Sequence, residues 1–160
     1  ALPLGFQQTI SQPYVVARMI EALRAGRDLG KTLEIGAGCG YQAAVLAQLT
    51  DEVYAVERIG PLLAKAKLNL RTIKQLKVRL KHADGQFGLP EAAPFDTIIV
   101  AAAAAHVPRA LLQQLAPNGR MILPLGTATQ QLVLIERRAE AYVETRLDAV
   151  RFVPLLSGVE

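Results

Sequence analysis

Three glycines alternate near the start of the chain, at Gly36, Gly38 and Gly40, in the run Leu33-Glu34-Ile35-Gly36-Ala37-Gly38-Cys39-Gly40. Glycine carries no side chain, so a ligand can lie against bare backbone and the turn can adopt positive φ angles. A helix expected to follow this run would add free backbone N–H groups at its N-terminus. The alternative is a merely tight turn between a strand and a helix, but three alternate glycines favour a ligand-binding loop.

The spacing of these glycines distinguishes between kinds of cofactor. A dinucleotide-binding loop has the pattern G-x-G-x-x-G. This chain has G-x-G-x-G instead, and Tyr41 stands where the third glycine of the dinucleotide pattern would be. A nicotinamide-dependent oxidoreductase is therefore disfavoured. The run, with Glu34 just before it, resembles the first motif of class I S-adenosylmethionine-dependent methyltransferases.

Two acidic residues follow later apolar segments. Glu57 comes after a strand expected at 52–56, roughly 20 residues past the glycine loop, where an acid can hold two ribose hydroxyls. Asp84 and Gly85 follow the next expected strand, where a carboxylate and nearby backbone can bind an adenine amino group. The alternatives are an exposed acid at a helix start for Glu57 and an ordinary Asp-Gly turn for Asp84. Ligands of open α/β sheets bind at the carboxyl ends of the strands, which favours the binding interpretation of both.

Short apolar runs alternate with longer helical patterns along the chain, and this alternation predicts the elements that carry these residues. Strands are expected at 32–35, 52–56, 78–82, 95–100, 120–123, 131–136 and 143–153. Helices are expected at 13–25, 41–49, 61–76 and 108–115.

The order of these elements predicts an α/β fold. Strands alternating with helices imply crossovers, and therefore a doubly wound, mostly parallel sheet with helices on both faces. No helix fits between the strands expected at 120–123 and 131–136, and a short connection requires antiparallel neighbours. We therefore expect a Rossmann-like sheet with an antiparallel C-terminal edge.

Composition excludes several classes of protein. The 160 residues are 51% hydrophobic and 20% charged, which indicates one globular domain over residues 1–160. The net charge is +4, but aromatic residues make up only 5%, too few for a base-stacking surface, so no nucleic-acid partner is expected. No apolar run is long enough to cross a bilayer, and the single cysteine, Cys39, fits a reducing compartment. We expect a cytoplasmic protein with no membrane partner, and no metal site, because His82 and His106 lack ligand spacing.

The N-terminal segment narrows the family. The run Gln8-Thr9-Ile10-Ser11-Gln12-Pro13-Tyr14-Val15-Val16-Ala17-Arg18-Met19 closely resembles a segment of protein-L-isoaspartate(D-aspartate) O-methyltransferases that most methyltransferases lack. The resemblance covers nearly the whole chain. Its other parts are the runs 36–47, 56–59, 84–85, 93–96, 107–108, 114–115, 119–126 and 152–155.

This resemblance implies a reaction and a set of site residues. The family uses S-adenosyl-L-methionine to methylate the free carboxylate of L-isoaspartyl or D-aspartyl residues, which initiates protein repair and leaves S-adenosyl-L-homocysteine. It implies that Ser11 is the catalytic residue. The residues implied to bind the cofactor are Thr9, Ile10, Gln12, Gly36, Gly38, Gly40, Glu57, Asp84 and Gly85.

Ser11 is better interpreted as a positioning hydroxyl than as a nucleophile. An acceptor carboxylate is already ionised and nucleophilic, so the enzyme mainly supplies proximity and in-line orientation. No serine–histidine–acid pattern accompanies Ser11 to activate it. Its structural alternative is the N-cap of the helix that begins near Pro13.

Three departures from the family pattern bear on the acceptor. The family's N-terminal region, which helps to close over cofactor and substrate, is expected to be missing. The run Gly5-Phe6-Gln7-Gln8 stands where Gly-His-Gly-Gln is common, and Ala101 stands in place of a threonine. The alternative functions are a methyltransferase of the same fold with another acceptor, and a catalytically impaired relative that binds the cofactor.

Overall fold

A computed structural model describes residues 2–160 of the chain. The strands are β1 (Leu2–Gly5), β2 (Gln8–Ile10), β3 (Thr32–Ile35), β4 (Val53–Glu57), β5 (Val78–His82), β6 (Phe95–Val100), β7 (Leu115–Gly126), β8 (Gln130–Arg138) and β9 (Ala141–Val150). The helices are α1 (Pro13–Arg24), α2 (Tyr41–Ala47), α3 (Gly60–Thr72), α4 (Arg109–Gln113) and the 3-10 turn η1 (Gly85–Phe87).

Seven strands form one sheet in the order β5-β4-β3-β6-β7-β8-β9. The pairs from β5 to β7 are parallel, and β7, β8 and β9 follow one another as antiparallel neighbours. The predicted mostly parallel sheet with an antiparallel C-terminal edge is therefore confirmed. Because β3 pairs with both β4 and β6, the direction of strand progression reverses at β3, and this is where open α/β sheets bind ligands.

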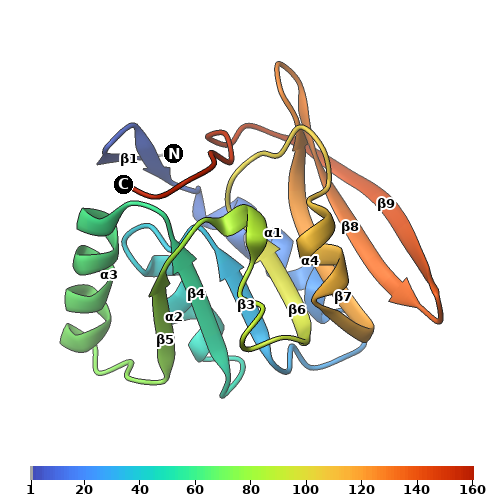
Figure 1. The fold of residues 1–160 in the computed structure, drawn as a ribbon, viewed down its shortest axis with the longest axis horizontal. Coiled ribbons are helices and arrows are strands. Elements are labelled where there is room, and N and C mark those ends of the chain that lie inside the picture. Colours follow the sequence, from blue (N-terminus) through green and yellow to red (C-terminus); the bar gives the residue numbers. More distant parts are fainter. Residues whose placement is uncertain (1) are drawn as a thin grey trace.

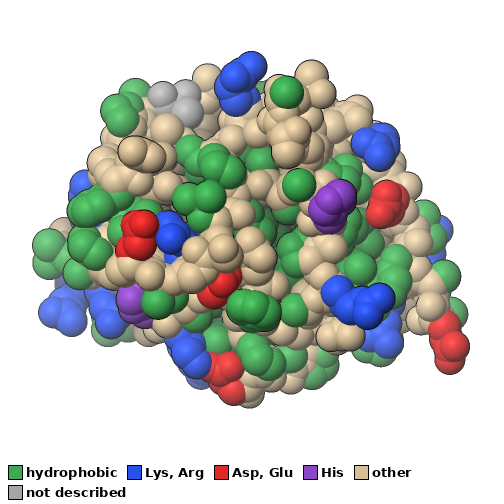
Figure 2. All heavy atoms as spheres, turned by 45° about the horizontal axis from the view of Figure 1, so that its top comes forward, with side chains coloured by type: hydrophobic (Ala, Val, Ile, Leu, Met, Phe, Trp, Pro, Cys, Tyr) green, Lys and Arg blue, Asp and Glu red, His purple; other side chains and the backbone are tan. Residues whose placement is uncertain are grey.

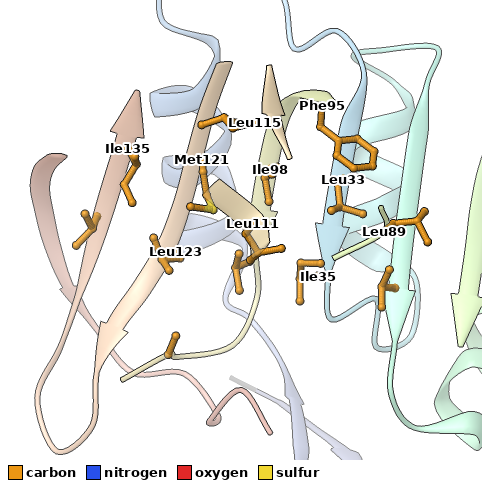
Figure 3. Close-up of a cluster of buried hydrophobic side chains, with 14 residues drawn as sticks. Leu33, Ile35, Leu89, Phe95, Ile98, Leu111, Leu115, Met121, Leu123 and Ile135 are labelled. Atoms are coloured by element: carbon orange, nitrogen blue, oxygen red, sulfur yellow. The ribbon is translucent and has the colours of Figure 1, made fainter. Parts of the chain in front are cut away.

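Apolar side chains cover both faces of this sheet. On one face, Leu111 of α4 and Leu89 pack with strand residues such as Leu33, Ile98 and Met121 (Figure 3). On the other face, α1 and α2 pack on the sheet, and their buried residues include Met19, Leu23 and Leu46. The sheet is thus a rigid central layer that holds the strand ends in place.

Two terminal segments lie over the carboxyl ends of the central strands (Figure 1). The first is the two-stranded hairpin of β1 and β2. The second is the tail after β9, residues 151–160, which runs beside the ends of β6 and β4 through Ala103 and Arg58. Together they cover the edge where the glycine loop lies.

Several expected boundaries were wrong. The helix predicted at 61–76 ends at Thr72, and the one predicted at 108–115 is only Arg109–Gln113. The strand predicted at 120–123 extends over Leu115–Gly126, and the last strand ends at Val150 rather than 153. Long antiparallel pairing of β7 and β8 explains the longer strand, since each hydrogen-bonded pair extends the ladder beyond the apolar core. The β1–β2 hairpin was not predicted.

No helix within residues 2–160 combines the length and the apolar character needed to cross a membrane.

Candidate active site

A slot opens at the carboxyl ends of β3 and β4, under the hairpin and the tail. Its lining comes from the hairpin with Ser11, one residue of α1, the glycine loop with the start of α2, the end of β4, the start of η1, the end of β6 and the tail. Figure 2, which brings this end of the molecule forward, shows hydrophobic side chains gathered around a hollow. The lining residues include Leu4, Thr9, Ser11, Gly36, Gly38, Gln42, Glu57, Gly85, Ala101 and Leu155.

The glycine loop needs glycine for conformation as well as for space. Gly36, Gly38 and Gly40 have φ angles of 91°, 55° and 91°, in the left-handed region that side chains disfavour. A Cβ on Gly38 would lie 3.2 Å from Leu4 of the hairpin, and one on Gly40 would lie 3.3 Å from Leu70 of α3. Gly36 and Gly38 therefore keep the slot open, whereas Gly40 lets the start of α2 approach α3.

Glu57 is buried and bonded to the backbone around the slot. Its Oε1 accepts from the N–H of Gly38 at 2.8 Å, and its Oε2 accepts from the N–H of Ile59 at 2.9 Å. Its exposure of 5% rules out the alternative of an exposed acid at a helix start. Each carboxylate oxygen keeps a further lone pair, so Glu57 can shape the loop and still accept from a ligand hydroxyl.

Ser11 is not the N-cap of α1. The N-cap position is Gln12, and no described side chain caps this helix. The Ser11 hydroxyl makes no hydrogen bond to another described residue, and Ser11 lines the slot. The N-cap alternative was therefore wrong, because the helix begins one residue later than that role requires, and the hydroxyl remains available to a ligand.

Asp84 organises the corner beside the slot rather than lining it. Its Oδ1 accepts from the N–H of Gln86 at 2.9 Å, which caps the turn η1, and its Oδ2 accepts from the N–H of Gly158 at 2.7 Å. Gly85 does line the slot, and a Cβ on it would lie only 2.4 Å from Ile35. A direct bond from Asp84 to adenine stays a prediction.

Arg58 lines the slot, and its guanidinium is bonded to residues of the tail. Its Nε donates to the carbonyl of Gly158 at 3.2 Å, its Nη2 donates to the carbonyl of Ser157 at 3.3 Å, and Glu160 lies 3.6 Å away. His82 Nε2 lies 2.8 Å from the Arg58 carbonyl and 2.9 Å from that of Glu160. These contacts fix the tail against β4 and β5 as one wall of the site.

Glu34 and Gln42 form a buried polar pair behind the glycine loop. Both carboxyl oxygens of Glu34 and the amide nitrogen of Gln42 lack a hydrogen-bond partner among the described residues. Burial raises the pKa of Glu34 to about 8, and the charge of Glu57 adds to this, while the nearby Gln42 amide opposes it without completing a hydrogen bond. Gln42 lines the slot, but its amide nitrogen is buried beside Glu34 and is not exposed to the slot.

The structure brings together seven of the ten predicted site residues and leaves three outside the slot. Those in the lining are Thr9, Ile10, Ser11, Gly36, Gly38, Glu57 and Gly85. Those outside it are Gln12, Gly40 and Asp84.

Sequence reasoning gave no site role to Gln42, Arg58 or the tail residues Val153–Leu156, which all line the slot. Gln42 and the tail residues 153–155 belong to the runs that carry the family resemblance, and Arg58 directly follows Glu57 in the sequence. That proximity was the available signal.

Histidine and cysteine do not form a metal centre in the part of the chain that the structure describes. No group of three His, Cys, Asp or Glu side chains is close enough to hold a metal ion in residues 2–160. Cys39 is a free, half-buried thiol in the glycine loop and lines the slot.

The residues present fit an adenosyl cofactor with an amino-acid tail. Bare backbone at Gly36 and Gly38 leaves room for it, and Glu57 can accept from ribose hydroxyls. The fold and this site together define a class I methyltransferase of Rossmann-like architecture.

Sequence comparison identifies the family. The model of the protein-L-isoaspartate(D-aspartate) O-methyltransferase family matches residues 1–160. A protein-L-isoaspartate O-methyltransferase of Dechloromonas aromatica is 73% identical over 161 residues, covering 100% of this chain and 74% of the relative. Another, from Aromatoleum aromaticum, is 67% identical, covering 100% of this chain and 73% of the relative.

Solved structures agree with this assignment. One named protein-L-isoaspartate O-methyltransferase superposes with a TM-score of 0.86 at 29% identity, covering 97% of this chain but only 51% of its own. A Plasmodium falciparum protein described by the same name, in complex with S-adenosyl-L-homocysteine, gives a TM-score of 0.83 at 25% identity, covering 97% of this chain and 79% of its own. The chain belongs to the protein-L-isoaspartate(D-aspartate) O-methyltransferase family.

Proposed function

We propose that this chain transfers the methyl group of S-adenosyl-L-methionine to the free carboxylate of L-isoaspartyl or D-aspartyl residues in damaged proteins, which initiates their repair. It is an S-adenosylmethionine-dependent protein carboxyl O-methyltransferase, and residues 1–160 act as one methyltransferase domain. The observation that carries this proposal is the unbonded hydroxyl of Ser11 at a slot built from the glycine loop and Glu57. Family membership supplies the acceptor. The lone cysteine is consistent with the cytoplasm as its compartment.

Binding of the cofactor is assigned to the slot. Glu57 holds the ribose, the backbone at Gly36 and Gly38 lies against the cofactor, and Gly85 borders the adenine, beside a corner that Asp84 orders. Thr9 and Ile10 border the cofactor from the hairpin side. Gln12 and Gly40 act indirectly, by setting the starts of α1 and α2.

Methyl transfer to a carboxylate requires no general base from the protein. When bound, S-adenosyl-L-methionine supplies a methyl carbon that its sulfonium charge makes electrophilic. The acceptor carboxylate is ionised at neutral pH, so no general base is needed, and the chain's residues contribute orientation and exclusion of water. Ser11 donates its hydroxyl hydrogen to one acceptor oxygen and aims the other along the line of attack. Arg58 directs its guanidinium to the tail, which leaves no free guanidinium from this residue to oppose the sulfonium.

The proposed function is tested by transfer of a radiolabelled methyl group. Two peptides of one sequence, one with L-isoaspartate and one with L-aspartate at the same position, are incubated separately with the protein and labelled cofactor. Label entering only the isoaspartyl peptide supports the proposal. Equal labelling of the two, or labelling of neither, refutes it.

A further inference from the structure

A second hollow adjoins the slot on the side of the antiparallel sheet edge. It is an open groove of about 830 Å³, a size in the range of small-ligand sites. Thr9, Ser11 and Val153 line both the groove and the slot. A molecule seated in the groove would therefore meet the slot at the Ser11 hydroxyl, where the acceptor carboxylate has to lie.

The two sides of this groove present unpaired backbone. On one side, β2 pairs with β1 and with no other strand among residues 2–160, so its other edge is free of described strands. On the other side, β9 is the last strand of the sheet, and beyond its end the backbone N–H groups of Arg151 and Val153 donate to no other described residue. Free strand edges bind extended peptides by backbone hydrogen bonds, which makes a peptide the fitting occupant.

A single charged residue faces this groove among the described residues that line it. Arg151 is exposed and makes no ion pair or hydrogen bond with another described residue, and the other lining side chains are apolar or neutral. The nearest acid along the chain, Asp148, is paired with Arg18 at 3.4 Å. A guanidinium has five N–H donors in a planar fork that matches a carboxylate, so Arg151 is complementary to an acidic side chain.

We propose that this groove binds the acceptor peptide in extended form and that Arg151 makes the enzyme prefer isoaspartyl residues flanked by acidic residues. The proposal rests on the proposed function, since it concerns the acceptor of the same site. Arg151 pairs with a flanking side chain and not with the acceptor carboxylate, because a guanidinium on the reacting oxygens would withdraw the electron density that attacks the methyl carbon.

The test uses three isoaspartyl peptides of one length, flanked on both sides by Glu, Gln or Lys. For the wild-type chain, we expect the lowest KM with Glu and the highest with Lys, each step about two- to fivefold, as for an exposed ion pair. Arg151→Ala should make the three KM values equal, and Arg151→Glu should reverse their order, while kcat changes little. The Glu preference should weaken in high salt.

The matched control is Arg24→Glu, which reverses one charge at the far end of α1. This variant should keep the wild-type order. An unchanged order in Arg151→Glu would overturn the proposal, and so would an equal loss with all three peptides, which would place Arg151 on the acceptor carboxylate.

A second readout separates this proposal from the proposed function. Fluorescence anisotropy measures binding of the same labelled peptides in the presence of S-adenosyl-L-homocysteine, without turnover. If no peptide is methylated but the binding order holds and reverses in Arg151→Glu, the groove proposal stands and the proposed function fails. Equal binding of the three peptides by the wild-type chain overturns the groove proposal.

Discussion

The carboxylate of Glu57 and the backbone N–H of Gly38 are joined by a hydrogen bond of 2.8 Å. This bond ties the end of β4 to the middle of the glycine loop, so the two parts of the site predicted from spacing form one unit. The second carboxylate oxygen of Glu57 accepts from the backbone N–H of Ile59 at 2.9 Å, just before α3 begins. Glu57 therefore fixes the conformation of the glycine loop and also places a carboxylate beside it.

Glu57→Gln should weaken both the loop and cofactor binding. An amide has only one acceptor oxygen, so one of the two N–H groups would lose its partner, at a cost of about 1–3 kcal/mol in unfolding free energy. We expect calorimetry to show at least about tenfold weaker binding of S-adenosyl-L-homocysteine, as for the loss of a charged hydrogen bond. Glu52→Gln, at an exposed position, is the control and should leave both quantities unchanged. Wild-type binding by Glu57→Gln would exclude the ribose role.

Ser11→Ala should slow methyl transfer without destabilising the protein. Its hydroxyl bonds to no described residue and caps no helix, so the melting temperature and the Kd for S-adenosyl-L-homocysteine should stay within error. We expect kcat for an isoaspartyl peptide to fall by about tenfold or more, since one orienting hydrogen bond is lost. Thr145→Ala, at an exposed position in β9 that lines neither hollow, removes a hydroxyl outside the site and should not change kcat. A large drop in melting temperature for Ser11→Ala would point to a structural role instead.

Gly38→Ala should weaken cofactor binding beyond its effect on stability. The residue has a φ of 55°, and a Cβ there would lie 3.2 Å from Leu4 of the hairpin. Gly26→Ala is a matched control, since Gly26 has a φ of 75° and nothing within 4 Å of its added Cβ. Chemical denaturation should show a loss of about 1 kcal/mol for both variants, the cost of a side chain in this backbone region. Only Gly38→Ala should also lose affinity for S-adenosyl-L-homocysteine. Equal affinities of the two variants would contradict the claim that the cofactor binds in the slot beside Gly38.

Glu34 should make stability depend on pH in the direction opposite to an ordinary carboxylate. Burial raises its pKa to about 8 from 4.5, so between these values the folded chain holds a proton that the unfolded chain releases. The stabilisation is fully present below pH 4.5 and is lost as the pH rises through about 8. For one proton, the unfolding free energy falls by up to about 1.4 kcal/mol per pH unit in this window.

The check for Glu34 is urea denaturation of the wild type and of Glu34→Gln at several pH values. The wild-type free energy should fall relative to that of the variant as the pH rises, because glutamine does not titrate. Glu140→Gln, in the exposed turn between β8 and β9, should keep the wild-type slope. Parallel curves for wild type and Glu34→Gln would show that the carboxyl group is ionised in the folded chain.

The parallel half of the fold could be predicted from sequence because its signals are local. The ranges 32–35, 78–82 and 95–100 are confirmed as strands. The third is a short, mostly apolar run, and the first two alternate apolar with polar or charged residues; both are local strand signals. The hairpin over Leu2–Ile10 could not be predicted in this way, because its strands lack a buried apolar face. It forms by pairing with itself above the slot, through contacts such as Leu4 with the loop.

The candidate site divides in a similar manner. Glycines and acids at strand ends are visible in sequence because their chemistry depends on residue type and spacing, as with Gly38 and Glu57. The tail is different, since Arg58 and Asp84 meet Gly158 across about half the chain, and only folding brings them together. The carboxylate of Asp84 bonds to the tail through such a long-range contact, and residue spacing could not indicate this role.

The central claim is that this slot methylates the isoaspartyl carboxylate and discriminates it from normal aspartate. Competition in one tube tests it most directly, with the isoaspartyl peptide and its aspartyl twin at equal concentration, labelled S-adenosyl-L-methionine, and chromatographic separation of the products. The account predicts label in the isoaspartyl peptide alone, and labelling about tenfold or more slower with Ser11→Ala while S-adenosyl-L-homocysteine still binds. Label shared equally by the two peptides, or carried by the aspartyl peptide, would contradict it.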